Sequence, residues 1–275
     1  MGGTTDNYGP IRGFKSSRLV IAMDSTVPIQ RAVQEAEYKF PYHYLDLESD
    51  RHRLIDFVPV MSRYELVRDR LGDVSGMAIL DAGCGDGRFC YEWRDSGARL
   101  VGVDYSERAI AFARAFVPEA EFHCADVSEM GAHGPFDRAV LIETLEHVPP
   151  DEVSGFLRSI ANVLRPGGKL IVTVPSKNRP VGRKHYQHFD EATMSQALSG
   201  SFDVGEVSGY GRNYDLRLKI RKRLAKMAYP ARRGSGWWSR MVTGYAEWFH
   251  RHYGEGPVAD SRGVIASATR KDVLV

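Results

Sequence analysis

Residues 78–89 read AILDAGCGDGRF, and this stretch decides the fold. Its apolar run ends at the acid Asp81, and a glycine-rich loop and a helical pattern follow. The loop carries glycines at three alternate positions, Gly83, Gly85 and Gly87. Glycine adopts positive φ values and lets a ligand approach the backbone, and the N–H groups at a helix start are free to bind an electron-rich group. The stretch therefore predicts a strand, a tight turn and a helix that together form a ligand site.

Three further apolar runs also end in an acid: residues 99–104 (RLVGVD), 120–126 (AEFHCAD) and 136–143 (FDRAVLIE). A fifth run, residues 164–175 (LRPGGKLIVTVP), combines a helix end, a Pro-Gly-Gly turn and a strand. Asp104 ends the run over residues 99–104, which is the second run along the chain. An acid at the tip of the second strand is placed to accept hydrogen bonds from a ribose diol, as in doubly wound nucleotide-binding folds.

Helical patterns alternate with these strands. We expect helices over residues 106–117, 151–164 and 190–199. Their candidate N-cap residues, which are short and polar, are Ser106, Asp151 and Asp190. Two more strands complete the pattern, over residues 203–207 and 263–270.

The series of motifs resembles the class I S-adenosylmethionine-dependent methyltransferases. The residues that carry the resemblance are 80–89 (LDAGCGDGRF), 101–106 (VGVDYS), 125–126 (AD), 136–149 (FDRAVLIETLEHVP) and 164–176 (LRPGGKLIVTVPS). They follow one another in the family order. The resemblance implies an α/β fold with a Rossmann-like, doubly wound, seven-stranded sheet whose last strand is antiparallel. An N-terminal helical lid and a helical insertion before the last strand are expected to be added to it.

The resemblance also implies that S-adenosylmethionine is the cofactor. Asp81, Gly83 and Gly85 would surround its methionine part, and Asp104 would hold its ribose hydroxyls. Around the adenine, the family pattern places Tyr105 and Ser106 as flanking residues, Asp126 as acceptor from the exocyclic amine and Val127 as backbone donor. Glu143, at the end of the fourth strand, is counted with the same cofactor-binding residues.

Length and composition bound the remaining choices. A chain of 275 residues accommodates one α/β domain with additions. We expect a flexible arm over residues 1–27, a helical cap over 28–75 and a methyltransferase core over 76–275. The net charge of +2 is too small to indicate that the protein as a whole is adapted to bind nucleic acid. The three cysteines form no C-x-x-C pair, and no run approaches the roughly 20 apolar residues of a membrane span, so a cytoplasmic protein is predicted.

The helical cap is rich in aromatic residues. Tyr42, His43, Tyr44 and Tyr64 could line a lid over the cofactor pocket and contact the acceptor. The alternative is that they simply pack the cap helices onto the sheet. His185, after the fifth strand, is a further candidate for acceptor contact.

The segment after the fourth strand carries the candidate chemistry. If residues 143–147 (ETLEH) form one helical turn, Glu143, Glu146 and His147 share a face, and two carboxylates with an imidazole can bind Mg²⁺, Mn²⁺ or Zn²⁺. His188 is the preferred fourth ligand and His185 its substitute. This E-x-x-E-H element looks like those of small-RNA 2′-O-methyltransferases and ubiquinone-biosynthesis O-methyltransferases. Alternatively, His147 and Glu146 act on the acceptor directly, without metal.

Residues 212–262 depart from the minimal family pattern. Their first part is strongly basic, with apolar residues spaced as on one helix face at Leu216, Ile220, Leu224 and Met227. Such a helix packs its apolar stripe on the domain, or it binds an anionic substrate, a membrane surface or nucleic acid.

Three functions are consistent with the sequence. The first is O-methylation of a small-molecule or sugar-containing acceptor by in-line methyl transfer. The second is metal-dependent 2′-O-methylation of RNA, which the basic helix favours and the near-neutral net charge disfavours. The third is an inactive fold that acts as a membrane-surface or interaction module.

Overall fold

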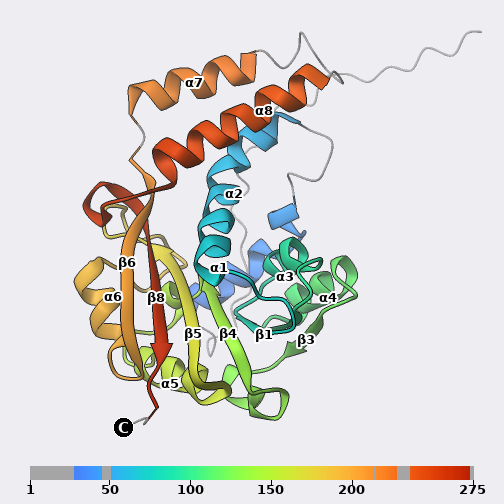
Figure 1. Cartoon of the computed structure of the whole chain (residues 1–275), viewed down its shortest axis with the longest axis vertical. Coiled ribbons are helices and arrows are strands. Elements are labelled where there is room, and N and C mark those ends of the chain that lie inside the picture. The colour runs from blue at the N-terminus through green and yellow to red at the C-terminus, as the bar shows by residue number, and fades with distance from the viewer. Residues whose placement is uncertain (1–27, 45–50, 214, 228–235, 273–275) are drawn as a thin grey trace, which may run out of the picture.

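The computed structural model describes residues 28–44, 51–213, 215–227 and 236–272. The predicted flexible arm, residues 1–27, lies outside the described residues. The described chain forms an α/β structure around one mixed sheet, with two helices beyond one end of it (Figure 1).

The sheet has the strand order β3-β2-β1-β4-β5-β8-β6-β7. Its strands are β1 (Ala78–Ala82), β2 (Arg99–Asp104), β3 (Glu121–Cys124), β4 (Phe136–Ile142), β5 (Leu164–Pro175), β6 (Phe202–Arg212), β7 (Glu255–Gly256) and β8 (Ser261–Arg270). The first five strands pair in parallel, and β8 pairs antiparallel with β5, which confirms the predicted antiparallel last strand. The predicted count of seven is one too low, because the two-residue strand β7 is too short to leave a pattern in the sequence.

The helices alternate with the strands as expected. The α-helices are α1 (Ile29–Glu37), α2 (Arg51–Leu71), α3 (Arg88–Trp93), α4 (Glu107–Phe116), α5 (Val153–Val163), α6 (Glu191–Leu198), α7 (Leu216–Met227) and α8 (Gly236–Phe249). Shorter helical turns are η1 (Tyr42–Tyr44), η2 (Val127–His133), η3 (Leu145–His147), η5 (His250–Gly254) and η6 (Val258–Asp260).

Both faces of the sheet are buried, which explains why its parallel strands read as continuous apolar runs. Ile79 and Leu80 are neighbours in β1, yet they belong to different cores. Leu80 packs on the face that η2, α5 and α6 cover, and Ile79 packs on the face that α2, α3 and α4 cover. The Gly-rich loop after β1 is thereby fixed between two layers of helices.

The helix starts agree with two of the three predicted caps. The Ser106 hydroxyl accepts from the Ala109 amide at the start of α4, and Asp190 forms a reciprocal capping box with Thr193 at the start of α6. Asp151 is not the cap of α5. That helix begins at Val153, and Glu152, the residue at its N-cap position, makes no side-chain hydrogen bond to the first turn.

Of the alternatives for the basic helix, packing of the predicted apolar stripe on the domain is wrong. In α7, Leu216, Ile220 and Leu224 are exposed, whereas Leu218 and Ala225 on the opposite face are buried. The side chain of Met227 lies outside the described part. The side of α7 that packs carries Leu218 and Ala225, which join the apolar residues of α2 and α8, and Lys222 and Lys226, which pair with Asp56 of α2 at 2.8 and 2.6 Å.

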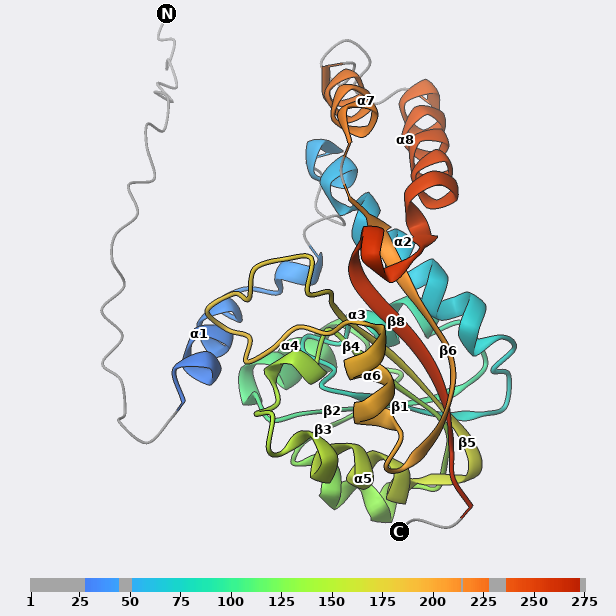
Figure 2. The ribbon, with the colours of Figure 1, turned by 90° about the vertical axis from the view of Figure 1, so that its left-hand side faces the viewer.

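The buried side of α7 joins α2 and α8 in a separate apolar cluster. Its buried members are Ile55, Val58, Leu218, Ala225, Tyr245, Phe249 and Tyr253. Figures 1 and 2 show α7 and α8 side by side over one end of α2, away from the sheet. None of the described helices is long and apolar enough to cross a membrane.

The cap of α6 gives a test of the fold. Asp190→Ala removes the acceptor for the Thr193 amide, a bond of 2.8 Å, and we expect it to lower the free energy of unfolding by about 1 kcal/mol. Urea denaturation followed by circular dichroism measures the change. Gln196→Ala, an exposed substitution in the same helix, is the control and is expected to stay within about 0.5 kcal/mol of the parent.

Candidate active site

A cavity of about 1270 Å³ lies at the carboxyl ends of β1, β2 and β4. Its walls come from the Gly-rich loop, from α1, η1 and α2, and from the loop between β5 and α6. In an open α/β sheet this is the edge at which ligands bind. The strand-end acids predicted from the sequence therefore meet at one site.

Asp104 organises the floor of this cavity. Its Oδ2 accepts from the Gly85 amide at 2.9 Å, and its Oδ1 accepts from the Ser106 amide at 2.9 Å. Its side chain is buried, and burial raises the pKa of its carboxyl, which the two amides partly oppose. The carboxylate of β2 thus holds the Gly-rich loop of β1 in place.

The glycines of the loop have no room for a side chain. Gly85 has a φ of +54°, and a Cβ there would lie 2.6 Å from the Tyr38 hydroxyl. Gly83 has a φ of +76°, and its Cβ would lie 2.3 Å from the Thr144 side chain. The backbone of this loop therefore forms a concave surface, which we call the glycine cradle, and a side chain at either glycine would clash with its neighbours.

Asp81 supports the fit of S-adenosylmethionine to this cradle. It lines the cavity, is only 2% exposed, and its Oδ2 has no hydrogen-bond partner. Burial raises the pKa of its carboxyl, and the neighbouring Asp104 adds to the shift. A buried acceptor without a donor fits the cationic amino group at the methionine end of the cofactor.

The residues predicted for the adenine end differ in their roles. Tyr105, Asp126 and Val127 line the cavity. The Tyr105 hydroxyl donates to Gln34 at 2.9 Å, and Asp126 Oδ1 accepts from the Ser128 amide at 2.8 Å. Ser106 is not among the described residues that line the cavity, because its hydroxyl points into the first turn of α4.

The aromatic residues of the cap fall into two groups, those that line the cavity and one that is buried beside it. Tyr42, His43 and Tyr64 line the cavity, and their contact with the acceptor stays a prediction. Tyr44 does not, because its ring is buried and stacks on Phe116 with centroids 4.1 Å apart. For Tyr44 the packing alternative is the one that the structure shows.

The lid segment is tied to the Gly-rich loop. His43 Nδ1 lies 2.8 Å from Oδ1 of Asp86, a carboxylate with no exposed area, and the His43 amide donates to the other oxygen of the same acid. Arg88 donates to the His43 carbonyl at 2.5 Å. Sequence reasoning missed Asp86 and Arg88, because their partner is more than 40 residues away in the chain.

Glu143 does not share a face with Glu146 and His147. Its φ of +55° places it outside the helical turn that begins at Leu145, and this corrects the predicted grouping. Its carboxylate instead accepts from the Tyr210 hydroxyl and pairs with Arg63 Nη1 at 3.3 Å. No local signal in the sequence pointed to these two partners.

Glu146 and His147 lie in the cavity wall. Glu146 is 1% exposed and its Oε2 has no partner, and burial, with the nearby Glu143, holds the pKa of its carboxyl well above the usual range. His147 Nδ1 lies 2.9 Å from the Lys184 carbonyl. A carbonyl only accepts, so Nδ1 carries the proton and Nε2 is left with a free lone pair.

A second histidine is fixed in the same way. His188 Nδ1 donates to the Arg179 carbonyl at 3.0 Å, so its Nε2 accepts from His185 Nδ1 at 2.8 Å. The lone pair of His185 is therefore also on Nε2. Burial, with the neighbouring His147, lowers the pKa of His185 to about 3, so this ring is neutral.

The predicted metal ligands are thus only partly brought together. The ligand atoms of Glu146, His147 and His185 all lie within 4.8 Å of one another. Glu143 is held by Arg63 and Tyr210, and both ring nitrogens of His188 are hydrogen-bonded. The structure therefore groups the substitute ligand His185, rather than His188, with Glu146 and His147.

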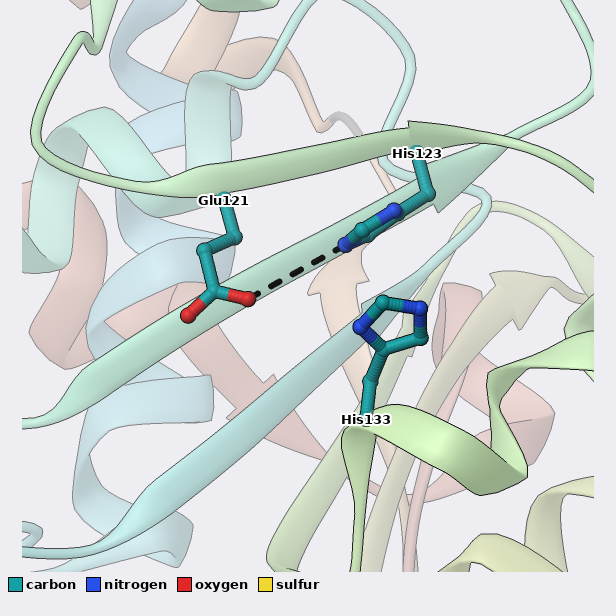
Figure 3. Close-up of side chains that lie close together, drawn as sticks. All are labelled: Glu121, His123 and His133. Carbon is teal, nitrogen blue, oxygen red and sulfur yellow. Dashed lines mark ion pairs between the residues drawn. The ribbon is translucent and has the colours of Figure 1, made fainter.

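One more group of metal-ligating side chains occurs in the described residues, Glu121, His123 and His133 (Figure 3). None of the three lines the cavity. Arg99 already pairs with Glu121 at 3.2 Å and donates to the His133 carbonyl at 2.6 Å. The Arg99 guanidinium therefore already supplies a positive charge beside the Glu121 carboxylate, where a metal ion would otherwise do so.

Comparison with known proteins agrees with this geometry. The profile of the methyltransferase domain family matches residues 79–168. The ubiquinone biosynthesis O-methyltransferase of Bradyrhizobium sp. (strain ORS 278) is 34% identical over 120 residues, which are 42% of this chain and 47% of the relative. The chain thus spans about half the length of the curated relatives it matches.

Solved structures show the same fold at low identity. An S-adenosylmethionine-dependent methyltransferase from Archaeoglobus fulgidus superposes with a TM-score of 0.53 at 17% identity and covers 77% of this chain and 94% of its own. The [4+2]-cyclase SpnF gives 0.50 at 21% identity, with coverages of 78% and 81%.

The sheet order, the glycine cradle and the acid at the end of β2 define a Rossmann-like fold of the kind that binds nucleotides at this edge of the sheet. The matched segment allows a more specific statement: residues 79–168 match the methyltransferase domain family, and the similarity to ubiquinone biosynthesis O-methyltransferases extends over 120 residues.

The role of Asp104 can be tested by ligand titration. Asp104→Ala is expected to weaken binding of S-adenosylhomocysteine by about 1–3 kcal/mol, because it removes the acceptor that orders the loop at Gly85. Glu146→Ala is expected to leave that affinity nearly unchanged. Isothermal titration calorimetry measures both, and an equal loss in the two variants would contradict the separation of cofactor and acceptor sites.

Proposed function

We propose that this chain transfers the methyl group of S-adenosylmethionine to a hydroxyl oxygen of a small-molecule or sugar-containing acceptor. The observation that carries the proposal is the free lone pair of His147 Nε2 in the same cavity as the Gly85–Asp104 cradle. The similarity to O-methyltransferases over 120 residues supports the choice of oxygen. The fold alone does not, since a cyclase shares it.

Besides positioning the acceptor behind the methyl group, the protein must perform one chemical step. The bound cofactor supplies an activated methyl group, but a hydroxyl acceptor must lose its proton as the new bond forms. His147 Nε2 takes that proton, and the Lys184 carbonyl stabilises the resulting cation through Nδ1. Burial lowers the pKa of His147, which keeps the ring neutral and ready to accept.

The cap holds the acceptor against the cofactor. Tyr42, His43 and Tyr64 supply the aromatic wall, and the His43–Asp86 contact fixes that wall to the Gly-rich loop. Lys184 Nζ pairs with Glu37 at 2.7 Å, so the loop after β5 that carries His185 is joined to the end of α1 (Figure 2). The segments that line the cavity are thereby joined to one another although they are distant in sequence.

Metal-assisted transfer is the second candidate, and one observation favours it. His147 and His185 each carry an unprotonated Nε2 and belong to one group with Glu146, whose Oε2 has no partner. Two imidazoles and a carboxylate would hold Mn²⁺ or Zn²⁺, with open positions for a vicinal diol or catechol. An RNA 2′-O-methyltransferase would use the same group on a terminal ribose.

Substitution of the two histidines separates these candidates. For direct proton removal, His147→Ala lowers turnover roughly 100-fold or more, whereas His185→Ala has a smaller effect, and EDTA has none. Release of S-adenosylhomocysteine is measured with monophenol, catechol and RNA probes. Binding of S-adenosylhomocysteine by each variant serves as the control for folding.

Loss of turnover in EDTA, with recovery on adding Mn²⁺ or Zn²⁺ and equal damage from both substitutions, would replace direct proton removal by metal assistance. Failure of the parent chain to bind S-adenosylhomocysteine would overturn the enzyme proposal and leave the interaction module.

A further inference from the structure

The outward face of α7 combines exposed apolar residues with positive charge. Leu216, Ile220 and Leu224 are 71%, 51% and 59% exposed. Their spacing of four residues places them in one row along the helix. No described residue covers this row, which we call the α7 stripe. Exposed aliphatic residues gathered in this way mark an interaction surface rather than a chance surface residue.

Basic residues border the α7 stripe on both sides. With 3.6 residues per turn, each residue advances by about 100°, so Arg217 and Arg221 fall on one side of the stripe and Lys219 and Arg223 on the other. All four are exposed, and α7 itself contains no acidic residue. The face is therefore an apolar row between two cationic rows.

The opposite face of α7 is already used for packing. Leu218 and Ala225 are buried against α2 and α8, and Asp56 pairs with Lys222 and Lys226. On one border of the α7 stripe, the Arg221 and Arg217 guanidinium groups lie 4.2 and 5.7 Å from the Trp248 ring centroid. These contacts fix the rotation of the helix, so the α7 stripe points outward as a consequence of folding.

We propose that α7 is an interfacial helix that docks this protein on an anionic lipid bilayer. The α7 stripe would enter the boundary between headgroups and acyl chains, and the flanking cations would bind lipid phosphates. Nucleic acid fits this face less well, because a phosphate backbone is met by centrally placed cations and three aliphatic side chains would remain in water. This inference does not depend on the proposed methyl transfer.

The position of α7 suits such docking. It lies at the far end of the α2–α7–α8 cluster, away from the sheet (Figures 1 and 2). In α2, Val58 belongs to that cluster, while the neighbouring Phe57 and Val60 line the cavity. Within about one turn, α2 thus joins the cavity to the apolar cluster on which α7 packs.

Vesicle co-sedimentation of the full chain tests the proposal. We expect binding to vesicles of phosphatidylcholine mixed with phosphatidylglycerol, little binding to phosphatidylcholine alone, and weaker binding in high salt. The triple variant Leu216→Gln, Ile220→Gln, Leu224→Gln keeps every charge, and we expect it to bind about tenfold or more weakly. Because these side chains are exposed, its circular dichroism and thermal midpoint should match the parent.

A matched charge control locates the effect. Lys219→Glu with Arg223→Glu should weaken vesicle binding strongly, whereas Arg108→Glu with Arg158→Glu, the same charge change on α4 and α5, should have much less effect. Unchanged binding by the stripe variant, or equal loss in both charge variants, would overturn the proposal. It would also be overturned if the parent ignored vesicles but formed a dimer, or bound RNA, through the stripe.

Discussion

The contact between the Asp104 carboxylate and the amides of Gly85 and Ser106 is the interaction on which the site depends. It joins the end of β2 to the loop after β1, two segments that the parallel pairing of these strands already places side by side. Burial makes this carboxylate costly to leave without donors. The loop therefore keeps its positive φ values and its open cradle, and the cavity keeps its floor.

The acceptor side of the cavity is organised by backbone carbonyls. The carbonyls of Lys184 and Arg179 belong to the loop after β5, and each fixes the proton of one imidazole on Nδ1. The result is an unprotonated Nε2 on His147, in the cavity wall with Glu146, and another on His185, whose Nδ1 donates to His188. Direct proton removal and metal binding need this same tautomer, so the arrangement is compatible with both, and only the response to metal distinguishes them.

The sequence predicted the parts that depend on local pattern. The strand-end acids, the alternate glycines and the caps at Ser106 and Asp190 are signals contained within a few residues. The grouping of Glu143 with Glu146 and His147 failed because a single positive φ at Glu143 removes it from the helical turn. The contacts of Arg63, Tyr210 and Asp86 join segments far apart in the chain, and no periodicity records such pairs.

The orientation of α7 shows why amphipathic pattern alone is not sufficient. The helix has aliphatic residues on two opposite faces, and the face with the larger residues was expected to pack. The other face packs instead: Leu218 and Ala225 join the apolar cluster of α2 and α8, and Lys222 and Lys226 pair with Asp56 beside them. The larger aliphatic residues then remain outside, so the partners available on neighbouring helices, which the pattern of α7 does not record, decide which of its faces is exposed.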